Sequence, residues 1–192
     1  MERPIRILGI DPGSRATGWA VIECIGSRLS FVGAGTIRPS RNGGRAERLA
    51  EILTSLNTVM DAKSPHEAAV EQTFVNASPR DALVLGEARG IALCAPALRG
   101  LPIAEYAANT VKKTVVGKGH ADKRQVQAMV RVLLPQSGDQ AADAADALAV
   151  AICHAHHRAM SVEAIATSSS PDKPEDKSVR ASKPSPIIRR SA

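Results

Sequence analysis

Up to about residue 160, apolar positions alternate between the spacing typical of strands and that typical of helices. Short apolar runs next to turn residues predict strands. These strands are Arg6–Ile10, Trp19–Ile25, Arg28–Ile37, Ala68–Glu71 and Leu101–Glu105. Apolar residues spaced 3.6 apart predict a helix after Gly43–Gly44 that carries Leu49 to Met60. Further predicted helices are Arg80–Ala95, Asn109–Val116, Ala121–Leu134 and Ala141–Arg158.

The order of these elements predicts an α/β domain with a mixed five-stranded sheet and helices on both faces. Gly26–Ser27 joins two strands in a hairpin, so the early strands are antiparallel, and the later crossovers predict parallel ones. We assign this domain to residues 1–159. Residues 160–192 are rich in Ser, Pro and charge, which predicts a disordered tail.

Composition narrows the class of protein. The chain has 192 residues, a net charge of +6 and a pI near 9.6, which favours a polyanionic partner. Its three cysteines are widely spaced, as in a reduced intracellular protein. The apolar run near the N-terminus is interrupted by Asp11, and no stretch has the length of a membrane span. We therefore expect a cytoplasmic protein without a membrane partner.

Four carboxylates lie in three separated places, each where a predicted strand end or helix face could aim the side chain at one shared point: Asp11, Glu71, Asp143 and Asp146. Asp11 follows an apolar strand, although it could simply cap the turn at Pro12-Gly13. Glu71 closes a buried strand and needs either an arginine or a metal as partner. Asp143 and Asp146 lie on one face of an otherwise apolar helix.

Acidic side chains brought together repel each other unless cations neutralise them. Mg²⁺ prefers oxygen ligands, so these residue types predict a metal-dependent active site. By contrast, Cys153 and the histidines after it are crowded at a helix end without a second half-site, which favours structural or surface roles over zinc binding.

Several motifs, in order across about residues 5–158, resemble the RuvC family of Holliday-junction resolvases. They are ILGIDPGSRATGWAVIE, AVEQTFVNAS, LGEARGIAL, EYAANTVKKTVVGKGHADKRQVQAMV and QAADAADALAVAICHAH. The resemblance implies a ribonuclease-H-like fold and a bacterial homodimer that cuts four-way DNA junctions by paired nicks. It also implies 5′-phosphate and 3′-hydroxyl ends, and cooperation with the RuvA–RuvB branch-migration complex.

The catalytic and metal-binding acids of that family map onto Asp11, Glu71, Asp143 and Asp146. The resemblance implies Mg²⁺, with Mn²⁺ as a substitute, and four acids can hold two ions roughly 3.5–4 Å apart. We expect Asp11 to be shared between both ions because it follows the predicted central strand.

Basic and aromatic residues predict the DNA contacts. Phe74 lies three residues beyond Glu71 and either stacks on an unpaired base or packs in the core. Basic side chains cluster further along the chain, where they either neutralise phosphates or form a solvated face: Lys112, Lys113, Lys118, Lys123 and Arg124. Gly86 and Gly90, four residues apart on a helix, permit close packing in a dimer or on the sheet.

Three alternatives remain open from the sequence. The chain could be another nuclease of the same fold, or a junction-binding protein without catalysis. The motif GIDPGSRATGWAV also resembles the phosphate loop of actin-like nucleotide-binding phosphotransferases, but those proteins need a second such domain and a second glycine-rich loop.

Overall fold

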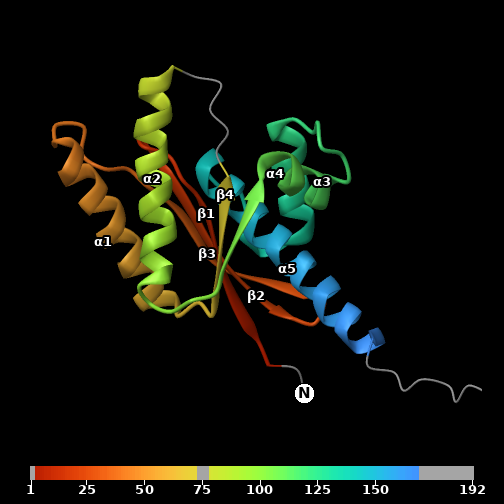
Figure 1. Cartoon of the computed structure of the whole chain (residues 1–192). Coiled ribbons are helices and arrows are strands. Elements are labelled where there is room, and N and C mark those ends of the chain that lie inside the picture. The colour runs from red at the N-terminus through yellow and green to blue at the C-terminus, as the bar shows by residue number, and fades with distance from the viewer. Residues whose placement is uncertain (1–2, 73–77, 169–192) are drawn as a thin grey trace, which may run out of the picture.

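The computed structural model describes residues 3–72 and 78–168, with side chains placed up to residue 159. Five strands form one sheet: β1 (Ile5–Asp11), β2 (Thr17–Ile25), β3 (Arg28–Ile37), β4 (Glu67–Gln72) and β5 (Ile103–Ala107). The helices are α1 (Arg45–Lys63), α2 (Pro79–Ala97), α3 (Ala108–Val116), α4 (Lys123–Leu133) and α5 (Ala142–Ser168), with a 3₁₀ turn, η1, at Pro135–Ser137. Figure 1 shows the sheet between two groups of helices.

The sheet order is β3-β2-β1-β4-β5, which places β1 in the centre. β1 is antiparallel to β2 and parallel to β4, and β4 is parallel to β5. The predicted mixed sheet is therefore confirmed, as is the hairpin, where Ile25 pairs with Arg28. Because β1 and β4 are parallel, both end at the same edge of the sheet.

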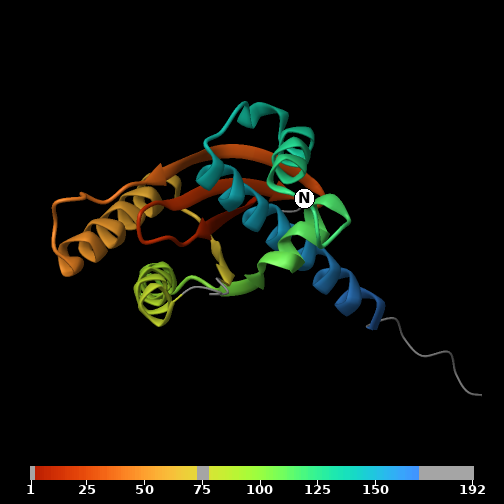
Figure 2. The same cartoon turned by 90° about the horizontal axis from the view of Figure 1, so that it is seen from above.

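Alternation along β1 separates two hydrophobic cores. Leu8 and Ile10 pack against α1 and α2 on one face, whereas Ile7 packs against α3, α4 and α5 on the other. Figure 2, viewed from above, shows these two helical layers on opposite sides of the sheet. The predicted arrangement of helices on both faces is confirmed.

Several elements end elsewhere than the sequence predicts. α2 continues through Pro96, which has no amide hydrogen to donate to the helix, and ends one residue later at Ala97. β5 begins after Pro102, whose carbonyl oxygen accepts a 2.9 Å bond from the Ala68 amide. α5 runs to Ser168, past its predicted end at Arg158 and into the predicted tail, through residues with good helix propensity such as Ala and Glu.

The rest of the predicted tail, residues 169–192, lies outside the described residues. Across the helices that are described, none combines the length and the apolar character needed to cross a membrane.

Candidate active site

Two of the predicted acids lie at or next to the last residue of neighbouring parallel strands. Ile10 pairs with Val70 in the register between β1 and β4, and the next residues are Asp11 and Glu71. Both carboxylates are half-buried at this edge of the sheet. Strand pairing alone therefore brings together two acids that are 60 residues apart in the sequence.

The other two acids, Asp143 and Asp146, lie in the first turns of α5. This helix packs directly on the sheet because glycines face it. A Cβ on Gly18 would lie 1.9 Å from the carbonyl oxygen of Asp143, and one on Gly9 would lie 2.2 Å from that of Ala147. The two glycines, on adjacent strands, thus set the closeness of the acidic end of α5 to β1.

The four acids lie close enough to one another to interact electrostatically. Burial raises the pKa of Asp11 from 3.8 to about 7, and repulsion from Glu71, Asp146 and Asp143 adds to the rise. Burial and Asp146 likewise raise the pKa of Glu71 to about 7. Asp11 and Glu71 are therefore harder to ionise, first because they are buried and second because other acids lie close to them.

Two basic side chains partly neutralise the acids. The Nζ of Lys123 lies 2.9 Å from Asp146 Oδ2, and Nη2 of Arg38 lies 3.4 Å from Asp143 Oδ2. Lys123 is the first residue of α4, whose start is fixed by a capping box between Asp122 and Gln125. Arg38 was not selected from the sequence, because its proximity to the acids depends on β3 ending at the same edge of the sheet.

The arrangement is not a ready-made metal cage. Among the described residues, no group of three or more His, Cys, Asp or Glu side chains is placed to hold an ion. The four acids face a common region, but two of them bond to cationic side chains instead. A cation that bound Oδ2 of Asp146 or of Asp143 would displace Lys123 or Arg38 from that atom.

The predicted DNA-contacting residues divide by position. Lys112 on α3 is half-buried and lowers the pKa of Glu71, so it lies beside the acids. Lys118, in the loop after α3, and Arg124, on α4, are exposed. Phe74 lies outside the described residues, so its stacking role stays a prediction.

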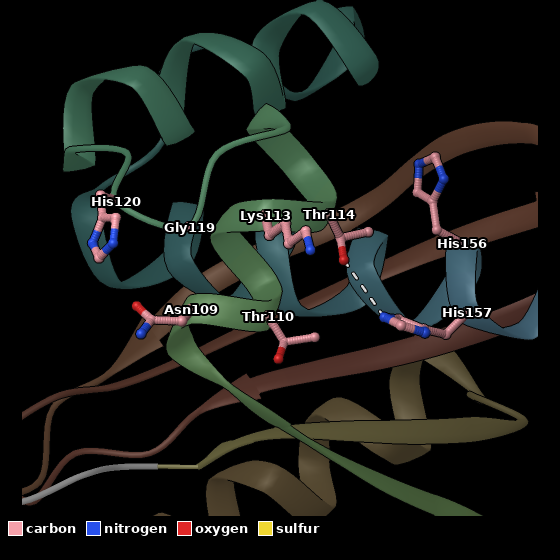
Figure 3. A pocket seen from close by; sticks show the side chains of 8 residues that line it. All are labelled: Asn109, Thr110, Lys113, Thr114, Gly119, His120, His156 and His157. Atoms are coloured by element: carbon pink, nitrogen blue, oxygen red, sulfur yellow. Dashed lines mark hydrogen bonds between the residues drawn. The ribbon is translucent and has the colours of Figure 1, made fainter.

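Lys113 instead lines a cavity of about 720 Å³ between α3, the following loop and α5. Figure 3 shows His120 and His156 at opposite ends of this cavity, with Lys113 and Thr114 between them. The His157 ring contacts the Thr114 hydroxyl at 3.5 Å. Lys112 and Lys113, although adjacent in the sequence, thus face different surroundings.

A polar network behind the acids ties α5 to the sheet. The Tyr106 hydroxyl lies 2.8 Å from His154 Nδ1, and His154 Nε2 lies 2.9 Å from Glu67 Oε2. Arg158 donates a 2.9 Å bond to the same carboxylate. Burial alone would raise the pKa of Glu67, but the bonds from Arg158 and His154 outweigh it and hold that pKa below its ordinary value.

This network was not found from the sequence. It connects two of the three elements that carry acids, because Glu67 begins the strand that carries Glu71, and His154 belongs to the helix of Asp143 and Asp146. His154 thus has the structural role expected for the histidines of this segment.

The chain is similar to several known proteins. The family model described as "Crossover junction endodeoxyribonuclease RuvC" matches residues 7–154. A protein of that name from Rhodopseudomonas palustris (strain BisB18) is 58% identical over 158 residues, covering 82% of this chain and 90% of the relative. Another of that name, from Brucella anthropi, is 54% identical, covering 82% of this chain and 92% of the relative.

Solved structures match as well. The Thermus thermophilus RuvC structure in complex with a Holliday junction substrate has a TM-score of 0.76 at 30% identity, covering 82% of this chain and 96% of that one. The yeast mitochondrial Holliday junction resolvase Ydc2 has a TM-score of 0.62 at 10% identity, covering 85% of this chain and 86% of that one. This second likeness supports the fold alone.

Proposed function

The chain belongs to the RuvC family of crossover junction endodeoxyribonucleases, and we propose that it resolves four-way DNA junctions by paired, symmetric hydrolysis of phosphodiester bonds. The observation that carries the proposal is the convergence of acids from β1, β4 and α5 beside basic side chains from α3 and α4. A phosphodiester substrate is anionic, so a site that cuts it needs both neutralisation of charge and activation of water.

We assign the catalytic and metal-binding roles to Asp11, Glu71, Asp143 and Asp146. Their oxygen atoms suit a hard divalent cation such as Mg²⁺ or Mn²⁺. Burial, together with repulsion from neighbouring acids, raises the pKa values of Asp11 and Glu71, and such cations would relieve that repulsion. Two ions bound there would activate water and stabilise the leaving 3′ oxygen.

The chain's own residues have separable tasks in this proposal. Asp11, on the central strand and repelled by three other acids, is the best candidate to be shared between two ions. Lys112 and Lys123 lie beside the acids and are placed to neutralise phosphates once DNA is bound. Lys118 and Arg124 are exposed and supply further positive charge, and Lys113 supplies it from the cavity between α3 and α5.

A homodimer suits a junction with approximate two-fold symmetry, because a two-fold dimer presents two identical sites. The surface we propose for it is α2. There, added Cβ atoms on Gly86 and Gly90 would meet nothing within 4 Å, and the Leu83 side chain is 65% exposed. We further propose cooperation with RuvA–RuvB in the bacterial cytoplasm, on the basis of the family and its bacterial members.

The decisive experiment uses a synthetic mobile junction, a DNA duplex and an RNA–DNA hybrid of matched sequence, each with Mg²⁺ or with EDTA. We expect symmetric, Mg²⁺-dependent nicks in the junction alone, with ligatable 5′-phosphate ends. Asp146→Asn should abolish them, whereas Asp139→Asn, at an 88% exposed side chain, should not. Equal cleavage of the hybrid would indicate another nuclease of this fold, and binding without cleavage would indicate a non-catalytic junction binder.

A further inference from the structure

Four arginines line one cavity beside the acids. This arginine pocket, of about 510 Å³, is formed by Arg15, Arg38, Arg41 and Arg48, together with Ala16 and Pro39. Arg15 lies in the turn after β1, Arg38 and Arg41 lie between β3 and α1, and Arg48 lies on α1. Three separate segments therefore contribute guanidinium groups to one hollow.

The pocket lacks a matching set of acids. Its lining contains no carboxylate, and within the described part of the chain neither Arg15, Arg41 nor Arg48 forms an ion pair. The acids near the start of α1 bond to backbone amides instead, Glu51 to that of Ser40 at 2.6 Å and Glu47 to that of Gly44 at 2.8 Å. Such an excess of positive charge favours an anionic ligand.

Arg48 is already held in place for such a ligand. It is half-buried, and its Nη2 donates to the carbonyl oxygen of Ser14, which fixes the guanidinium against the turn after Asp11. Its Nε is buried and has no acceptor among the described residues. A buried donor without a partner is unfavourable, so an acceptor supplied by a ligand would relieve that cost.

The pocket adjoins the acids directly. Arg38 lines it and also contacts Asp143 at 3.4 Å, and Arg15 follows Asp11 by four residues. In the sheet order β3-β2-β1-β4-β5, the pocket lies toward β3, whereas α3 follows β5 on the other side of the acids. The acidic site thus has arginines on one flank and lysines on the other.

We propose that the arginine pocket binds a backbone phosphate of the cut DNA strand, next to the phosphate that is hydrolysed. Guanidinium groups match phosphate oxygens with paired hydrogen bonds, which lysine cannot reproduce. The inference rests on the proposed function, because it assigns a subsite for the same DNA substrate. A phosphate bound in the arginine pocket would determine which phosphate of the DNA strand lies over the acids.

The test neutralises one phosphate at a time. A series of synthetic junctions carries a single uncharged methylphosphonate at successive positions around the cut, and binding to the full chain is measured in EDTA across a range of salt. For the unaltered chain we expect one flanking position at which affinity falls roughly tenfold and the salt slope falls by about 0.9. In the Arg41→Ala and Arg15→Ala variants, an uncharged phosphate at that position should lower the affinity no more than one at the neighbouring positions.

Arg28→Ala is the matched control, because Arg28 is exposed at the start of β3, whereas Arg38 follows the end of that strand. It should keep the full methylphosphonate profile of the unaltered chain. Arg41→Lys keeps the charge but not the paired hydrogen bonds, so it should retain the salt slope and lose part of the affinity. Circular dichroism and thermal unfolding establish that each variant is folded.

The outcomes separate the two proposals. If folded Arg15→Ala and Arg41→Ala show the same methylphosphonate profile as the unaltered chain, the pocket does not bind that phosphate, while junction cleavage stands. If the unaltered chain binds junction no better than duplex, the proposed function fails and the subsite fails with it.

Discussion

Replacing Asp11 with asparagine should make the chain more stable at alkaline pH when divalent cations are removed. Burial, followed by repulsion from Glu71, Asp146 and Asp143, raises the pKa of Asp11 from 3.8 to about 7. The ionised carboxylate is therefore disfavoured in the fold. Asparagine keeps the shape of the side chain but cannot carry the charge.

The stability of the fold depends on pH because Asp11 binds its proton more tightly in the folded state than in the unfolded state. Between pH 3.8 and about 7 the folded state holds a proton on Asp11 that the unfolded chain has lost, so stability falls as pH rises through this window. Because one pKa unit corresponds to about 1.4 kcal/mol, the rise sets an upper limit of about 4 kcal/mol on the penalty above pH 7. We expect Asp11→Asn to exceed the unaltered chain by about 2–4 kcal/mol at pH 8, and by little near pH 4.

Urea unfolding in EDTA, followed by circular dichroism from pH 4 to pH 8.5, measures this difference. Asp139→Asn is the control, since its 88% exposed side chain pairs with Arg131 at the surface and should contribute less than about 1 kcal/mol. Adding Mg²⁺ should stabilise the unaltered chain more than Asp11→Asn and so narrow the gap. If Asp11→Asn is no more stable at pH 8, or its advantage persists at pH 4, Asp11 is not held in a desolvated, repulsive site.

Three further predictions concern α5, α2 and the network behind the acids. Gly18→Ala should destabilise the fold by about 1–3 kcal/mol, because its Cβ would lie 1.9 Å from the Asp143 carbonyl oxygen; unchanged urea unfolding would contradict this. Leu83→Glu should give a monomer in sedimentation, whereas Val132→Glu, at similar exposure (65% and 67%), should not; a dimer of Leu83→Glu would exclude α2 as the interface. Tyr106→Phe removes a 2.8 Å contact with a histidine of α5 and should lower the unfolding free energy by about 1 kcal/mol, seen as a lower urea midpoint.

Local pattern was enough to predict where two of the acids lie. Asp11 and Glu71 each follow an apolar run, and parallel strands that end at one edge bring their following residues together. The spacing of Asp143 and Asp146 likewise placed them on one helix face. In each case the pattern that places the acid extends over only a few neighbouring residues, so the sequence alone was enough to predict its position.

What the sequence did not reveal depends on contacts between distant segments. From the sequence around them, the glycines at positions 9 and 18 look like ordinary strand residues. Only the packing of α5 on the sheet shows that a Cβ at either position would collide with the backbone of that helix. Arg38 bonds an acid 105 residues away, and Glu67 bonds a histidine 87 residues away. Neither pair leaves a pattern that spacing along the chain could show.

The closeness of α5 to the sheet explains why the acids need basic neighbours. With glycine at positions 9 and 18, the start of α5 lies against β1 and β2, so Asp143 and Asp146 are held near Asp11 by backbone packing. Repulsion cannot be relieved by moving the helix without giving up a large part of the core, because α5 is buried along most of its length up to Ala155. The remaining relief is electrostatic, from Lys123 and Arg38, whose side chains are 69% and 62% exposed and can leave the acids without disturbing the core. Both are therefore placed to exchange a carboxylate for a phosphate when DNA arrives, one from each flank of the site.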